Sequence, residues 1–139
     1  MDYEKWLIKD YEHWGIYLHG NQYYLGRCYI WAKRENVLDF FDMNQEEQEE
    51  YFNIGRELKN ALNNLFNPDL YNYATLANVS PHLHTHIIPR YKFQREMFGA
   101  LFVDGRWGKN YAPYDKDFKI PEDTLIKIKD LISEELSKQ

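Results

Sequence analysis

Residues 82–88 constrain the fold more than any other segment, because histidine alternates there with less polar side chains. The segment reads His-Leu-His-Thr-His-Ile-Ile. Successive side chains of a β-strand point to opposite faces, so the three histidines would share one face and Leu83, Thr85 and Ile87 the other. The second face suits a hydrophobic core, whereas three imidazoles in a row do not. The pattern therefore predicts a half-buried strand with a candidate functional site on its polar face.

Short apolar runs bounded by turn residues predict the other strands. We expect them at Trp14–Leu18, Arg27–Lys33 and Tyr71–Leu76, besides His82–Ile88. A turn at His19–Asn21 would lead into a return strand that begins at Tyr23–Leu25. On the strand after Gly26, the side chains of Cys28, Ile30 and Ala32 would share the core face.

Capping residues and apolar periodicity predict two helices. Asn44 and Glu47 have the spacing of a capping box, and apolar positions at helical spacing follow from Tyr51 to Phe66. A last helix is expected from Pro121 to about Lys138. A short helix is expected within Tyr3–Tyr11, and irregular structure from Phe93 to Lys119.

Hairpin, helix, hairpin and helix in this order predict one α+β domain over residues 1–139. Its fold class would be an antiparallel sheet of about five strands with one long helix and a C-terminal helix. A chain of 139 residues is long enough to bury about two thirds of its unfolded surface in one core.

Charge and composition exclude several classes of function. A formal net charge of −5 argues against a general nucleic-acid binder, although a local pocket on an acidic protein can still bind an anion. The single cysteine, Cys28, permits neither an intramolecular disulfide nor a cysteine-based metal site. No apolar run approaches the ~20 residues of a membrane span, and the acidic N-terminus is unlike a signal peptide. We therefore expect a cytoplasmic protein that binds neither membrane nor nucleic acid.

Three interpretations of the histidine face remain open on chemical grounds. The histidines could be solvated surface residues, but three at strict period two argue against this. Two of them, at i and i+2, could share a zinc ion with acidic residues from elsewhere, but His82 and His86 would stand about 13 Å apart along an extended strand, too far for all three to bind one ion easily. They could also perform nucleophilic catalysis, since neutral imidazole is a nucleophile when its other nitrogen is fixed as a donor. The third interpretation explains the pattern best.

These residues resemble the motif of the histidine triad (HIT) superfamily, in which three histidines alternate with apolar residues. Thr85 is the one loose match, and Pro89-Arg90 continues the motif as in many members. The strand and basic pair within Gly26–Arg34, and the segment Leu38–Met43 that leads into the long helix, are also similar to that family. The resemblance covers Gly26 to Arg90, about half of the chain.

The resemblance implies hydrolysis or transfer at a nucleoside α-phosphate, with no metal in the chemical step and no cofactor. His84 would form a covalent nucleotidyl-histidine, His86 would bind a phosphate oxygen, and His82 would orient the nucleophile through its carbonyl. The partner would be a small-molecule nucleotide, such as a dinucleoside polyphosphate or a nucleoside phosphoramidate, and the assembly a homodimer. The alternative is a nucleotide-binding or scaffolding protein with weak or lost catalysis.

Two departures from the family affect the expected substrate contacts. Arg27 stands where members often carry a fourth histidine, and the loop before the triad has no glycine. We expect Asn72, Asn78 and Ser80 to supply the polar contacts of that loop. Arg27 would offer its guanidinium to a phosphate, or it would be a solvated residue of the strand end. His19 would lie near the ribose, or it would be an ordinary turn residue. Trp107 is open between base stacking, packing across a dimer and loop anchoring.

Overall fold

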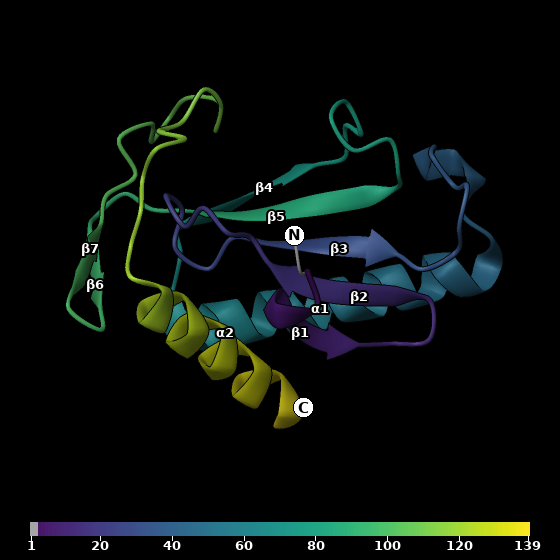
Figure 1. The fold of residues 1–139 in the computed structure, drawn as a ribbon, viewed down its shortest axis with the longest axis horizontal. Coiled ribbons are helices and arrows are strands. Elements are labelled where there is room, and N and C mark those ends of the chain that lie inside the picture. The colour runs from purple at the N-terminus through teal and green to yellow at the C-terminus, as the bar shows by residue number, and fades with distance from the viewer. Residues whose placement is uncertain (1–2) are drawn as a thin grey trace.

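The computed structural model describes residues 3–139, and it contains the expected five-stranded antiparallel sheet (Figure 1). Along the sheet the strands follow the order β1-β2-β3-β5-β4. Their bounds are β1 Leu7–Asp10, β2 Trp14–Leu18, β3 Cys28–Ala32, β4 Leu70–Ala74 and β5 His84–Arg90. A separate hairpin consists of β6 Arg95–Met97 and β7 Ala100–Phe102. The expected fold class is confirmed.

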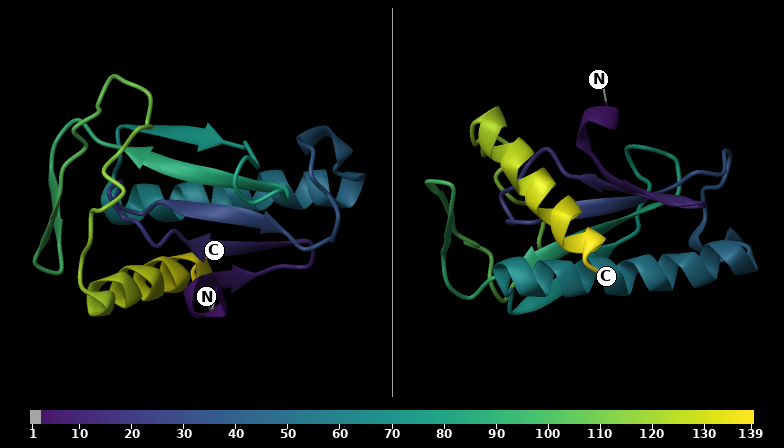
Figure 2. Two further views of the ribbon diagram at one scale, coloured as in Figure 1. Left: turned by 45° about the horizontal axis from the view of Figure 1, so that its top comes forward. Right: turned by 90° about the horizontal axis from the view of Figure 1, so that it is seen from below.

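Two helices cover one face of this sheet, α1 (Gln45–Phe66) and α2 (Glu122–Ser137) (Figure 2). Asn44 caps α1 as predicted, since its side chain accepts from the Glu47 N–H while the Glu47 carboxylate accepts from the Asn44 N–H. Two short 3₁₀ helices lie at Tyr3–Trp6 and Phe40–Asp42.

The core lies between this face and the helices. Alternate residues of β2 and β3 are buried there, as expected for Cys28, Ile30 and Ala32. The matching positions of the helices are also buried; they are Ile54, Leu58, Ala61, Leu62 and Phe66 of α1, and Ile128, Ile132 and Leu136 of α2. Neither α1 nor α2 covers the opposite face of the sheet.

Four expectations about local structure were wrong. The helix expected within Tyr3–Tyr11 ends at Trp6, because Leu7–Asp10 pairs with β2 as an edge strand. Tyr23–Leu25 is not a strand, since the buried Gln22 side chain bonds to His19 O, Arg27 O and Gly26 N and folds this segment into a compact loop.

The other two errors concern the triad strand and the region from Phe93 onward. β5 begins at His84 rather than His82 and continues through Pro89. Its pairing with β3 ends at Ile87, so the proline lies where the strand has a partner on one side only. The expected irregular region from Phe93 to Lys119 contains the β6–β7 hairpin.

Within residues 3–139, no helix combines the length and the apolar character needed to cross a membrane.

Candidate active site

The face of the sheet that α1 and α2 leave uncovered carries the histidines together with aromatic side chains. In the ladder between β3 and β5, Trp31 lies opposite His84 and Tyr29 opposite His86. Directly opposed residues of antiparallel strands project to the same face, so these four rings form one surface. Tyr17 of β2 extends it, with its ring stacked 5.2 Å from that of Tyr29.

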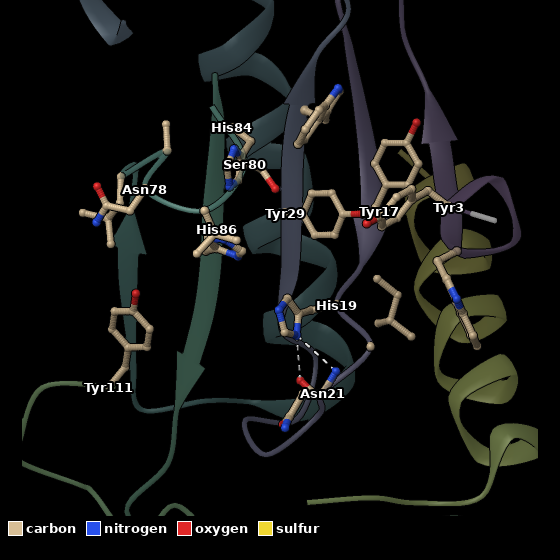
Figure 3. Close-up of a pocket in the computed structure, with 17 residues that line it drawn as sticks. Tyr3, Tyr17, His19, Asn21, Tyr29, Asn78, Ser80, His84, His86 and Tyr111 are labelled. Atoms are coloured by element: carbon tan, nitrogen blue, oxygen red, sulfur yellow. Dashed lines mark hydrogen bonds between the residues drawn. The ribbon is translucent and has the colours of Figure 1, made fainter. Parts of the chain in front are cut away.

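A cavity of about 690 Å³ lies on this surface, a size typical of small-molecule sites (Figure 3). His84 and His86 form part of its wall. Six aromatic residues also line it: Tyr3, Trp6, Tyr17, Tyr29, Trp31 and Tyr111. Among the described residues, the lining includes no Asp, Glu, Lys or Arg. The walls are therefore mostly apolar, with a few polar side chains distributed among them.

His84 is held by the main chain immediately before it. Its Nδ1 lies 2.6 Å from the carbonyl oxygen of His82, and the residue is only 8% exposed. A carbonyl oxygen can only accept, so Nδ1 carries the proton and Nε2 keeps its lone pair.

His82 supports this arrangement from outside the cavity lining. Its Nε2 is 2.5 Å from the carbonyl oxygen of Ala32, and its ring stacks 4.4 Å from the Trp31 ring. The two contacts fix the residue whose carbonyl holds His84. Because His82 precedes β5, the three imidazoles do not form one regular row, although His84 and His86 do share a face.

His86 and His19 form the other side of the histidine group, with ring centroids 5.5 Å apart (Figure 3). Burial, and secondarily the charge of Arg27, lowers the pKa of His86 to about 3 and that of His19 to about 4. Both rings are therefore neutral at pH 7. His19 Nδ1 lies within hydrogen-bond distance of the backbone of Asn21, which also lines the cavity.

The loop before β5 forms one rim of the cavity, and it brings Asn78 and Ser80 to the site. Both residues are exposed. Ala77 has φ 54°, a left-handed conformation that favours glycine, so the loop keeps a glycine-like backbone although it has no glycine.

Arg27 is on the site face but does not line the cavity. It is 3% exposed, and its guanidinium lies 5.4 Å and 4.9 Å from the ring centroids of Tyr111 and Tyr114. Its Nη2 is 3.4 Å from His86 Nδ1. Direct contact between this guanidinium and a phosphate, as expected from sequence, is not supported by this position, because aromatic rings and His86 surround it.

Asn72 likewise lies away from the cavity lining. Its side-chain oxygen accepts from Arg90 Nη1 at 2.7 Å, and Arg90 also forms a buried ion pair with Asp104 at 2.7 Å. The same guanidinium bonds to the carbonyl oxygens of Arg106 and Lys109. This network attaches residues 103–114, which we call the strap, to the far end of the site face and encloses Asn72.

The remaining lining residues differ in how far the sequence indicates them. Tyr17, Tyr29 and Trp31 could have been identified from strand parity, because they alternate with core positions. Tyr111 could not have been identified in this way, since its position depends on how the strap is held. Tyr24, outside the strap, donates from its Oη to Tyr111 O at 2.6 Å. Trp107 is not in the lining, and the Lys92 ammonium lies 5.8 Å from its ring centroid.

An antiparallel sheet that presents closely spaced histidines over a cavity defines the class of histidine triad proteins. The HIT domain model matches residues 8–93, which is more than half of the chain, and the chain belongs to this family. Its members generally bind or hydrolyse nucleotides. Among curated proteins, no sequence is similar enough to match.

Solved structures agree with this assignment at the level of the fold. Histidine triad proteins from Bradyrhizobium japonicum and Sinorhizobium meliloti superimpose with TM-scores of 0.77 at 16% identity. The alignments cover 94% of this chain and 89% of the first protein, and 93% and 87% for the second. A histidine triad protein from Marinobacter aquaeolei gives a TM-score of 0.71 at 18% identity, covering 95% and 88%.

Proposed function

We propose that this chain hydrolyses or transfers a nucleotidyl group at the α-phosphate of a nucleotide, with His84 as the nucleophile. One observation carries the proposal: the contact of 2.6 Å between His84 Nδ1 and the His82 carbonyl oxygen. It leaves the lone pair of Nε2 free on a ring that lines the cavity.

The reaction then has two steps. His84 Nε2 attacks phosphorus, an N–P bond forms, and the bond from phosphorus to the leaving group breaks with its electron pair going to that group, which takes up a proton. Water next attacks the same phosphorus, the N–P bond breaks, and a nucleoside monophosphate leaves as the water gives up a proton. In a transfer reaction another hydroxyl or amine replaces water. His86 would donate to the phosphoryl oxygens during both steps.

The cavity supports a nucleotide as the small-molecule partner. Its aromatic walls could stack against the base of a nucleotide. Asn78 and Ser80 on the rim would bind polar groups of the substrate, and His19 would lie near the ribose. The substrate would be a dinucleoside polyphosphate or a nucleoside phosphoramidate.

We also propose a homodimer, acting in the cytoplasm without metal in the chemical step. The dimer is supported by β4, which is an edge strand of the sheet. Its large apolar side chains Leu70 and Tyr73 are 52% and 59% exposed, and a second copy of the chain could cover them. Light scattering of the purified protein would measure its mass, and a monomer at micromolar concentration would contradict this part.

The test is a panel of dinucleoside polyphosphates and nucleoside phosphoramidates, assayed with and without a chelator. Turnover that survives the chelator, together with the mass of one nucleoside monophosphate added to His84 in rapidly quenched samples, would support the two-step scheme. Turnover without any adduct would contradict it. Tight nucleotide binding without turnover would favour a binding or scaffolding role.

A further inference from the structure

Arg27 is the one buried cation beside the catalytic histidines in the described part of the chain, and it has no carboxylate partner there. Its Nε and Nη1 atoms are buried without a hydrogen-bond partner. Its polar contact is from Nη2 to His86 Nδ1, at 3.4 Å. Burying a charge is costly unless hydrogen bonds or an opposite charge compensate it. The buried guanidinium of Arg27, with two unpaired nitrogens, therefore calls for an explanation.

Aromatic rings hold the guanidinium in place of an ion pair. Tyr114 and Tyr111 lie 4.9 Å and 5.4 Å from it, within the range of cation–π attraction. The strap that carries these rings is anchored by Arg90 and by the hydrogen bond from Tyr24. The position of Arg27 relative to His86 is therefore set by two segments far apart in sequence.

The donor and acceptor roles in this contact follow from chemistry. A guanidinium can donate hydrogen bonds but cannot accept them, and it stays charged at every relevant pH. His86 Nδ1 must therefore accept, which leaves the proton of the neutral ring on Nε2. His84 has the opposite arrangement, with its proton on Nδ1.

We propose that Arg27 is a positioning residue that fixes His86 in the tautomer with its proton on Nε2. The consequence of this tautomer for catalysis rests on the proposed function. His84 would present a lone pair on Nε2 to the substrate, whereas His86 would present an N–H donor. The ring centroids of His84 and His86 are 5.0 Å apart, so both can act on one phosphoryl group.

The charge of Arg27 also disfavours protonation of His86. The groups that face this ring are Arg27, His19, His84 and Tyr29, and none of them is an anion at pH 7. Burial, Arg27 and the two neighbouring histidines together hold its pKa low. A histidine at position 27 would supply a fixed charge only when protonated, whereas arginine supplies it throughout.

The experiment is nitrogen-15 NMR of the histidine rings at pH 7, which reports which nitrogen of each ring carries the proton. It is applied to the wild type, to Arg27→Met, which removes donor and charge at similar length, and to Arg27→Lys, which keeps both. We expect His86 to carry its proton on Nε2 in the wild type and in Arg27→Lys. In Arg27→Met we expect a mixture of tautomers and a raised His86 pKa, while His84 keeps its proton on Nδ1.

Two results would overturn the assignment: a wild-type His86 with its proton on Nδ1, or an unchanged His86 tautomer in folded Arg27→Met. Because the first of these results comes from the wild-type spectrum, the assignment can be overturned even if Arg27→Met does not fold. Turnover gives a second readout, and kcat should fall by up to about 100-fold in Arg27→Met, the scale for a misplaced catalytic group, while KM changes less. If the wild type turns over no nucleotide, the proposed function fails, but the tautomer result still tests Arg27.

Discussion

His84 and His86 lie two residues apart on one strand, yet they are held in different ways. His84 is oriented by the carbonyl of His82, a main-chain group two residues away. His86 is contacted by the side chain of Arg27, whose own position depends on Tyr111 and Tyr114 in the strap. The first arrangement is local, and the second requires the completed tertiary structure.

This difference has a mechanical consequence. Any chain that forms β5 with His82 in place will orient His84, because a main-chain carbonyl cannot be removed by substitution. The orientation of His86 can be lost through changes at Arg27, in the strap or in its anchor at Arg90. We therefore expect mutations far from the cavity to affect His86 and to leave His84 unaffected.

The largest effect is expected from His84→Ala. If His84 is the nucleophile, its removal should lower kcat by several orders of magnitude, since no other group replaces the covalent step. Steady-state kinetics on the best substrate of the nucleotide panel would measure this. Near-native turnover in the folded variant would eliminate His84 as the nucleophile.

The second prediction concerns the anchor of the strap. Asp104→Asn leaves Arg90 buried without its carboxylate, and we expect the free energy of unfolding to fall by about 3–5 kcal/mol. Urea unfolding would measure it. The matched control is Asp117→Asn, which removes an exposed carboxylate of the following segment and should change stability by no more than about 0.5 kcal/mol. Equal stability of the two variants would contradict an anchoring role for the Arg90–Asp104 pair.

The third prediction separates the two histidines in function. His86→Ala should lower kcat by about 10²–10³-fold, equivalent to about 2.7–4 kcal/mol, because in the proposed mechanism it removes a donor to the phosphoryl oxygens but not the nucleophile. The adduct on His84 should still form in quenched samples. A loss as complete as that of His84→Ala, with no adduct, would show that the two residues do not have separate roles.

The sequence predicted those parts of the molecule that depend on neighbouring residues. Strand parity identified the buried side of β3 and placed His84 and His86 on one face, and the capping box located the start of α1. Both signals are local, since they arise from backbone geometry over a few residues. The triad motif added the identity of the family.

Contacts between distant segments could not be predicted in this way. Asn72 and Arg27 have side chains suited to a phosphate, but Arg90 of β5 bonds to Asn72, and two aromatic rings of the strap pack against Arg27. Tyr111 reaches the cavity only because the same strap is anchored to the sheet. The sequence of residues 103–114 has no apolar periodicity that would indicate where this segment lies.

The smallest expected effect tests the buried, neutral state of His86 through stability. An unfolded histidine has a pKa of about 6.5, whereas folded His86 has a pKa of about 3. Between these values the unfolded chain binds a proton that the folded chain does not, so the contribution to stability is present above pH 6.5 and is lost as pH falls toward 3. For one such histidine the loss between pH 6.5 and 5.5 is roughly 1 kcal/mol.

Urea unfolding of the wild type and of His86→Asn at several pH values would measure this contribution. Carboxylates and the other histidines titrate in both proteins, so the difference between the two curves isolates His86. We expect the free energy of unfolding to fall less steeply with decreasing pH in the variant, because asparagine takes up no proton when the chain unfolds. His19→Asn should behave similarly, since burial lowers the pKa of that ring to about 4. Parallel curves for the wild type and His86→Asn would mean that His86 protonates as readily in the folded protein as in the unfolded chain, which would contradict a buried, neutral His86.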